Sequence, residues 1–222
     1  NNAGLNSLNI RQAYLTFGDK SWGSVKLGKD LGIFASDAIL SDITLLGVGG
    51  ASAGGGNTSL GRIGFGYLYA DWKPQISYTT PNFSGFQATV GISQAWTAQD
   101  SLSAVTSASN NASPAYEGKA SYSFAANDVN GKIWVSGFTQ KVDGVAQGDN
   151  QAWSADIGAN LKVAGFDLTG YYYGGSGIGQ TVQLRDGFDL NGKARDSYGG
   201  YVQGKYTLPT KTVASISWGQ SN

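Results

Sequence analysis

The residue types in this chain point away from the common reactions of enzymes. The 222 residues include no His and no Cys, which removes histidine-activated nucleophiles, histidine general bases, and imidazole or thiolate metal ligands. The glycine clusters are not followed by the Gly-Lys-Ser/Thr of a phosphate-binding loop. The sequence therefore predicts a protein that is not an enzyme and needs no cofactor or metal.

One segment does gather oxygen ligands. Asp186, Asp189 and Asn191 lie close together within a long polar stretch, 175–197. They lack the alternating Asp and Asn spacing and the distal Glu of a calcium loop. A solvated turn is the preferred interpretation, and calcium binding is the alternative.

Composition narrows the class of protein. The 15 basic and 15 acidic residues balance, and they are scattered without the basic stripe that nucleic acid requires. Charged residues make up only 14%, while aromatic residues reach 12% and glycines number 34. Such a chain is too aromatic to be disordered and too rich in glycine to be helical. The sequence has no run of about 18 apolar residues, so it predicts no transmembrane helix.

Two-residue alternation is the dominant pattern, and its segments are long. In 153–163, Trp153, Ala155 and Ile157 share one face with the apolar residues that follow, and polar residues and glycine occupy the other. Eleven alternating residues suit a tilted strand crossing a bilayer, which needs about 9 to 11. On this basis we predict ten strands, at 8–17, 23–29, 74–81, 86–96, 115–126, 131–141, 151–163, 166–174, 198–208 and 212–219. In 131–141 alternation leaves the lipid-facing side open.

The predicted connections alternate between short turns and long loops. The long ones are 30–73, 97–114, 142–150 and 175–197. This alternation of short and long connections is typical of an outer-membrane barrel, which has tight periplasmic turns and extended outer loops. Aromatic residues near the strand ends fit an interfacial belt. We therefore predict an all-β, transmembrane, antiparallel up-and-down β-barrel, with a soluble adhesin-like β domain as the alternative.

Two stretches carry a family resemblance. RQAYLTFGDKSWGSVKLGKD (11–30), a long loop, and then ISYTTPNFSGFQATVGI (76–92), with its Pro-Asn-Phe-x-Gly-Phe turn at 81–86, resemble the trimeric general porins of Gram-negative bacteria. Beyond residue 92 the sequence resembles outer-membrane barrels only in the general pattern of strands and connections. Such porins have about 16 strands. The resemblance therefore implies that 1–222 is a single barrel domain, incomplete at both ends.

The resemblance also implies a function and partners. It predicts a water-filled channel in the bacterial outer membrane for passive diffusion of small hydrophilic solutes and ions. Homotrimers, membrane lipid and lipopolysaccharide are the expected partners, and nucleic acid is not. The strands near the constriction loop lie on the trimer side in that family. The residues expected to meet another subunit or lipid are Tyr14, Val25, Leu27, Ile76 and Tyr78.

The loop 30–73 is the expected constriction. It is too apolar for a freely solvated segment, and its run 47–56 is almost all Gly, Ala and Ser, so it suits folding back inside a barrel; an extracellular lid is the alternative. Residues 37–46 could form a short helical turn. The resemblance implies loop acids facing wall bases. The constriction candidates are Asp37, Asp42, Arg11, Arg62, Lys26 and Lys73, with Asp30 and Lys29 weaker. Bases outnumber acids, which favours anion preference.

Two further functions stay open beside general diffusion. The first is a barrel enzyme of the protease or phospholipase type. Enzymes of that type resemble ones that use a catalytic histidine, and this chain has no histidine. A substrate-selective porin, for sugar or anion, is the stronger alternative. The aromatic-rich strands 166–174 and 198–208 would support sugar recognition through Tyr171, Tyr172, Tyr173 and Tyr201.

Overall fold

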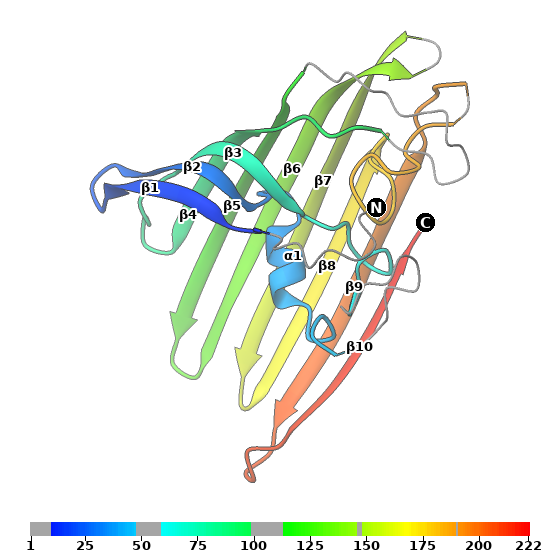
Figure 1. The fold of residues 1–222 in the computed structure, drawn as a ribbon. Coiled ribbons are helices and arrows are strands. Elements are labelled where there is room, and N and C mark those ends of the chain that lie inside the picture. Colours follow the sequence, from blue (N-terminus) through cyan, green and yellow to red (C-terminus); the bar gives the residue numbers. More distant parts are fainter. Residues whose placement is uncertain (1–9, 48–58, 99–112, 146–147, 190) are drawn as a thin grey trace.

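The computed structural model describes residues 10–47, 59–98, 113–145, 148–189 and 191–222. Ten antiparallel strands form one sheet in which each strand pairs with its neighbours in sequence. This confirms the predicted up-and-down order. Within the described residues β1 and β10 are the two edges and do not pair with each other. Figure 1 shows the sheet curving around the segment that carries the single labelled helix.

The strand bounds lie close to the predicted ones, and most strands are longer than those of soluble sheets. The elements are β1 (Ala13–Asp19), β2 (Gly23–Leu31), α1 (Ser36–Ser41), β3 (Trp72–Thr79), β4 (Phe86–Ser93), β5 (Ala115–Ala126), β6 (Val129–Val145), β7 (Gly148–Val163), β8 (Phe166–Ser176), β9 (Asp196–Thr207) and β10 (Val213–Ser221). Residues 8–9 of the first predicted strand and 48–56 of the glycine-rich run lie outside the described residues. In the part of the chain that is described, no helix is long and apolar enough to cross a membrane.

One predicted loop is wrong. Residues 142–150 were expected to connect two strands, but β6 continues to Val145 and β7 begins at Gly148. Val142 pairs with Asn150, and the register shifts between Val142 and Val145. Continued backbone pairing, which satisfies the N–H and C=O groups, therefore extends both strands of this hairpin into 142–145 and 148–150, whose Gly, Asp and Asn content is typical of a loop.

The two faces of the sheet differ in polarity, as the alternation predicts. On β7, Trp153 and Ile157 are exposed on the outer face, while Ser154 and Asp156 are buried on the inner face. The structure also orients β6: Ile133 and Val135 point outward and Trp134 points inward. The Trp134 ring lies over Gly158 of the facing strand, where a Cβ atom would meet the ring at 2.1 Å. Periodicity alone could not orient β6, because this inward side chain is a large aromatic.

Aromatic side chains gather on the outer surface near the short turns. Phe17 lies 6.3 Å from Trp22, and Phe166 lies 4.5 Å from Tyr206, between ring centroids. The turn 81–86 is built locally: the Asn82 side chain accepts a hydrogen bond from the Gly85 N–H at 2.7 Å. Aromatic residues gathered in this way resemble the girdle that transmembrane barrels have at a membrane interface.

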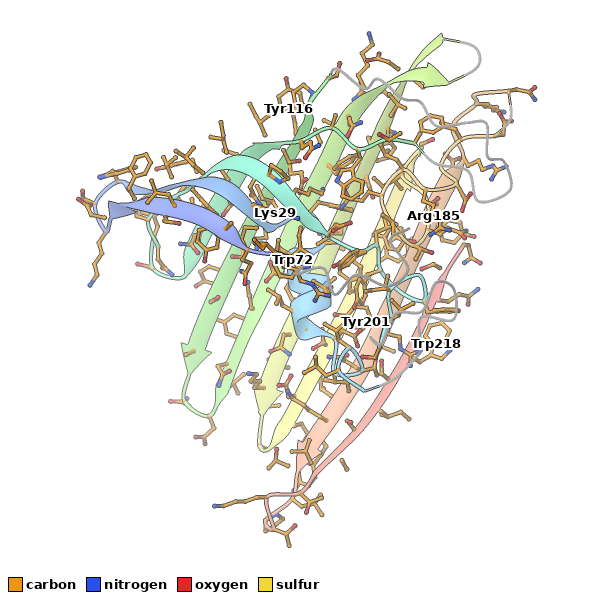
Figure 2. The ribbon with its side chains drawn as sticks, in the orientation of Figure 1. Lys29, Trp72, Tyr116, Arg185, Tyr201 and Trp218 are labelled. Atoms are coloured by element: carbon orange, nitrogen blue, oxygen red, sulfur yellow. The ribbon has the colours of Figure 1, made fainter. Side chains whose placement is uncertain are left out.

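The described parts of the long segment between β2 and β3, 32–47 and 59–71, lie on the inner face of the sheet. Phe34, Ala38 and Ile39 are buried there, and the Phe34 ring packs 6.2 Å from Phe138 of β6. The Tyr201 hydroxyl of β9, labelled in Figure 2, donates to the Ala38 carbonyl at 2.8 Å. The described parts of the loop thus fold inward, with α1 shorter than the helical turn expected over 37–46.

Tyr14 does not face outward as expected. In the β1–β2 register it belongs to the same side as Lys26, whose ammonium lies 4.7 Å from the Tyr14 ring centroid. The inner face of this strand pair is polar enough to accept a phenol. Val25, Leu27, Ile76 and Tyr78 occupy the opposite side, as the registers of β1–β2 and β2–β3 require.

A charge on the outer face should destabilise the protein far more than the same charge on the inner face. We expect Ile157→Lys to cost about 2–4 kcal/mol, as for a lysine placed against hydrocarbon near a bilayer midplane. The matched control Ser123→Lys lies on the exposed part of the inner face and should change stability by less than about 0.5 kcal/mol. Denaturant unfolding of both variants from lipid vesicles measures the difference. Equal stability of the two variants would contradict the assignment of the faces.

Candidate functional site

A polar pocket of about 580 Å³ lies between α1 and the inner faces of the neighbouring strands. Side chains from β2, β3, β5, β6 and α1 line it, among them Lys26, Asp30, Ser36, Gln75, Lys119 and Lys132. Inward-pointing positions on several strands therefore converge on the helix of the loop. The pocket lies where the described part of the loop meets the inner face of the sheet.

Asp37 is the acid of the loop that meets bases of the wall. Its carboxylate lies 2.8 Å from the Lys119 ammonium of β5 and also contacts the Lys132 ammonium of β6. Lys119 further donates to the Ser36 hydroxyl at 3.0 Å. Burial alone would raise the pKa of Asp37, but the two lysines outweigh it and hold the pKa below its ordinary value. The resulting stabilisation is present above the unfolded-state pKa and is lost as the pH falls through the lowered one.

A second ion pair lines the same pocket. The Lys26 ammonium contacts the carboxylate of Asp30, which lies four residues further along β2. Gln12 donates to the other oxygen of Asp30 at 2.8 Å. Lys26 is about one third exposed, so its charge still faces the pocket. The weaker candidate Asp30 thus lies at the site together with Lys26.

Asp42 has a different position from Asp37. Its carboxylate is buried and accepts hydrogen bonds at 2.8 Å from the Arg62 N–H and the Tyr67 hydroxyl. Burial and the Asp42 charge raise the pKa of Tyr67, so the phenol stays a donor. These contacts hold residues on either side of the undescribed part of the loop against each other.

The two arginine candidates have different surroundings. Arg62 belongs to the loop, and its guanidinium donates to the Ser217 hydroxyl at 3.0 Å and to the Ser217 carbonyl of β10. Arg11 precedes β1 and is exposed. The charge of Arg11 opposes the rise in the pKa of Tyr69 that burial and Asp71 cause. Neither arginine lines the polar pocket.

Lys73 forms a buried ion pair with a residue that sequence reasoning did not single out. Its ammonium lies 2.5 Å from the Glu117 carboxylate of β5, and both side chains are about 1% exposed. Lys73 also donates to Gln183 at 2.6 Å. Glu117 accepts from the N–H groups of Ile33 and Phe34, at 2.7 and 2.8 Å. This pair holds the beginning and the end of the inward segment on the wall.

The structure thus brings together Asp37, Lys26 and Asp30 around one pocket and adds Lys119 and Lys132, which were missed as site residues. The signal for Lys119 was present in its parity, because 115–126 places Glu117 and Lys119 on the face opposite Tyr116 and Tyr122. Lys132 could not be assigned while the faces of β6 were open. Lys29 pairs with Ala13 and Pro74 on the outer side of the register.

The oxygen-rich segment of the β8–β9 connection forms a turn. One carboxylate oxygen of Asp189 accepts hydrogen bonds from the N–H groups of Asn191 and Lys193, both at 2.9 Å. Among the described residues, no three acidic, His or Cys side chains cluster to hold a metal ion.

Comparison with known proteins agrees with this arrangement. A family model described as Gram-negative porin matches residues 1–222. The chain belongs to the Gram-negative porin family. Among solved structures, an anion-selective porin from Comamonas acidovorans matches with a TM-score of 0.57 and 16% sequence identity, which shows a shared fold. The match covers 93% of this chain and 55% of that one, so this porin chain spans about half the length of the solved relative. No curated protein sequence matches it.

Removing one member of the buried pair in this porin should cost more than removing both. Glu117→Ala leaves the Lys73 charge buried and unpaired, and we expect a loss of about 3–5 kcal/mol. Adding Lys73→Met removes that charge, so the double variant should be more stable than the sum of the two single effects predicts. Denaturant unfolding of the four proteins in detergent measures the coupling. Additive effects would show that the two side chains do not depend on each other.

Proposed function

We propose that this porin forms a water-filled channel in the bacterial outer membrane for passive diffusion of small hydrophilic solutes and ions. The observation that carries the proposal is that the described parts of the loop between β2 and β3 lie on the inner face of the sheet. The outer face is apolar and ends in an aromatic girdle, as hydrocarbon and headgroups require. We further propose that the ten strands are part of a larger barrel of about 16 strands.

The constriction we propose is the pocket beside α1. Asp37 on the loop faces Lys119 and Lys132 on the wall, and Lys26 and Asp30 continue the charged lining. Opposed charges in a narrow space orient water and favour polar solutes over apolar ones. Arg11, Arg62, Asp42 and Lys73 remain proposals as selectivity residues. The contacts of Arg62, Asp42 and Lys73 support a role in holding the loop.

Anion preference is the second part of the proposal. Three lysines and Asp30 line the pocket, and Asp37 beside it pairs with two of these lysines. Together these five side chains leave one positive charge in excess. The solved relative is named an anion-selective porin, and its likeness in fold is compatible with this preference. Basic side chains lining a pore favour anions by electrostatic attraction.

Sugar selectivity has less support from the described residues. Tyr171, Tyr173 and Tyr201 point inward but are buried beneath the loop segments, at 5% exposure or less. Tyr172 is exposed on the outer face. A sugar would need an aromatic ring open to water, which none of these four positions offers on the inner face.

For assembly we propose a homotrimer embedded in membrane lipid and lipopolysaccharide. Val25, Leu27, Ile76 and Tyr78 form a continuous outward patch over β2 and β3. Apolar patches of this kind are covered by a partner or by lipid. The mass of the full-length protein in mild detergent tests the trimer, and a uniform monomer would contradict it.

Bilayer recordings test the channel and its charge selectivity together. Full-length protein should give stable conductance, and under a salt gradient its reversal potential should indicate anion preference. We expect Lys119→Gln with Lys132→Gln to move that potential toward cations, because the basic wall is lost. The matched control is Lys141→Gln, an exposed lysine on the outer parity of β6, and it should leave the potential unchanged.

Two outcomes of these recordings would contradict the proposal. Absence of conductance from the folded protein would contradict the channel itself. An unchanged potential after Lys119→Gln and Lys132→Gln would contradict the proposed constriction. Arg11→Ala with Arg62→Ala, recorded in parallel, tests the arginine candidates; a shift there and none in the lysine variant would favour them.

A further inference from the structure

A second charged cluster lies on the inner face, nearer the short turns than the pocket. The Asp167 carboxylate of β8 lies 2.9 Å from the Lys205 ammonium of β9 and 3.7 Å from the Lys162 ammonium of β7. The Asn160 amide donates to the other oxygen of Asp167 at 2.5 Å. In the register, Lys162 faces Asp167 and Asp167 faces Lys205. The three charges therefore form a row across three adjacent strands, directly before the turn at 164–165.

This second cluster is continuous with the lysines at the pocket. Lys132 of β6 pairs with Asn160 of β7, and Lys162 lies two residues further along β7 on the same face. Diagonal neighbours of this kind have Cα atoms roughly 7–8 Å apart. An ion that leaves one of these lysines would thus have the other lysine as its diagonal neighbour on the wall.

The two clusters have the same composition and the same excess of charge. Asp37 lies between Lys119 and Lys132, and Asp167 lies between Lys162 and Lys205. Each group of two lysines and one aspartate carries one net positive charge. The other inward acids of these strands, Glu117 and Asp156, are buried and hydrogen-bonded, Asp156 to the Ser136 N–H and the Tyr171 hydroxyl. They do not face the water beside the lysines.

The lysines of the second cluster are open to solvent. The side chains of Lys162 and Lys205 are 53% and 39% exposed, while that of Asp167 is 14% exposed. The shared aspartate can therefore position both ammonium groups while leaving each with free donors. A lysine has three N–H donors, so an anion can bind without displacing Asp167.

We propose that Lys162 and Lys205 form a second anion-binding step, on the short-turn side of the constriction, from which small inorganic anions pass to Lys132 and Lys119. This inference rests on the proposed channel function and adds a site to it. Conduction needs binding strong enough for entry and weak enough for release. Asp167 meets the second condition, because its charge limits how tightly the two lysines hold an anion.

Bilayer recordings in potassium chloride gradients test the step. Lys162→Gln with Lys205→Gln should lower the chloride-to-potassium permeability ratio by roughly two- to threefold, the modest effect expected for partly solvated charges. Lys141→Gln removes an outward lysine and should leave the ratio unchanged. Asp167→Asn should raise the ratio and make chloride conductance saturate at a lower concentration, because the lysines lose their competing anion.

The outcomes separate this inference from the channel proposal. A wild-type protein that does not conduct would contradict the channel itself. A conducting wild type whose permeability ratio is the same in Lys162→Gln with Lys205→Gln would overturn the second step alone. If that double variant does not fold, Asp167→Asn decides: an unchanged ratio and unchanged saturation would overturn the step.

Discussion

The buried ion pair between Lys73 and Glu117 is the interaction on which the position of the inward loop depends. The loop leaves β2 with two N–H groups, those of Ile33 and Phe34, that no strand satisfies, and Glu117 accepts both. A carboxylate buried this deeply is stable only with a matching cation and further donors, which Lys73 and Ser93 provide. The same ion pair therefore satisfies backbone at one end of the loop and a side chain at the other.

The pair can exist because the sheet separates its two faces. Every strand that crosses hydrocarbon must present apolar residues outward and pair all of its backbone groups. Away from the strand ends, charged residues then have only the inner face, where water or the loop can meet them. Burial of Phe34 against Phe138 adds apolar stabilisation on that face, roughly 1.5–3 kcal/mol for one fully buried large side chain. The alternation of apolar and polar residues therefore creates the inner face on which both the loop and the ion pairs lie.

Local pattern was enough to predict the architecture. Strand existence and order followed from alternation and turn signals, and the apolar residues at the start of the loop indicated that they are buried. Pattern was not enough for single side chains. Asp37 and Asp42 are both loop acids in the sequence, yet Asp37 meets wall lysines while Asp42 joins the two limbs of the loop. Their difference depends on contacts between residues distant in sequence, which no spacing encodes.

The misplaced elements have similar causes. Tyr14 was expected outward because the family resemblance places its strand on the trimer side, but the register places it beside Lys26. For Lys73, a constriction candidate, the ion pair with Glu117 was not foreseen because this partner lies 44 residues away in sequence. Residues 142–145 and 148–150 include turn-forming types, and strand pairing overrides them.

Cysteine accessibility tests the central claim, which is that the inner face holds water and the outer face holds lipid. These 222 residues contain no cysteine, so single substitutions report on one position each. Ser121→Cys lies in the polar pocket beside α1, and Val135→Cys lies on the outer face. A charged, water-soluble thiol reagent should reduce bilayer conductance of the first variant and leave the second unchanged. Block through Val135→Cys without block through Ser121→Cys would contradict the account.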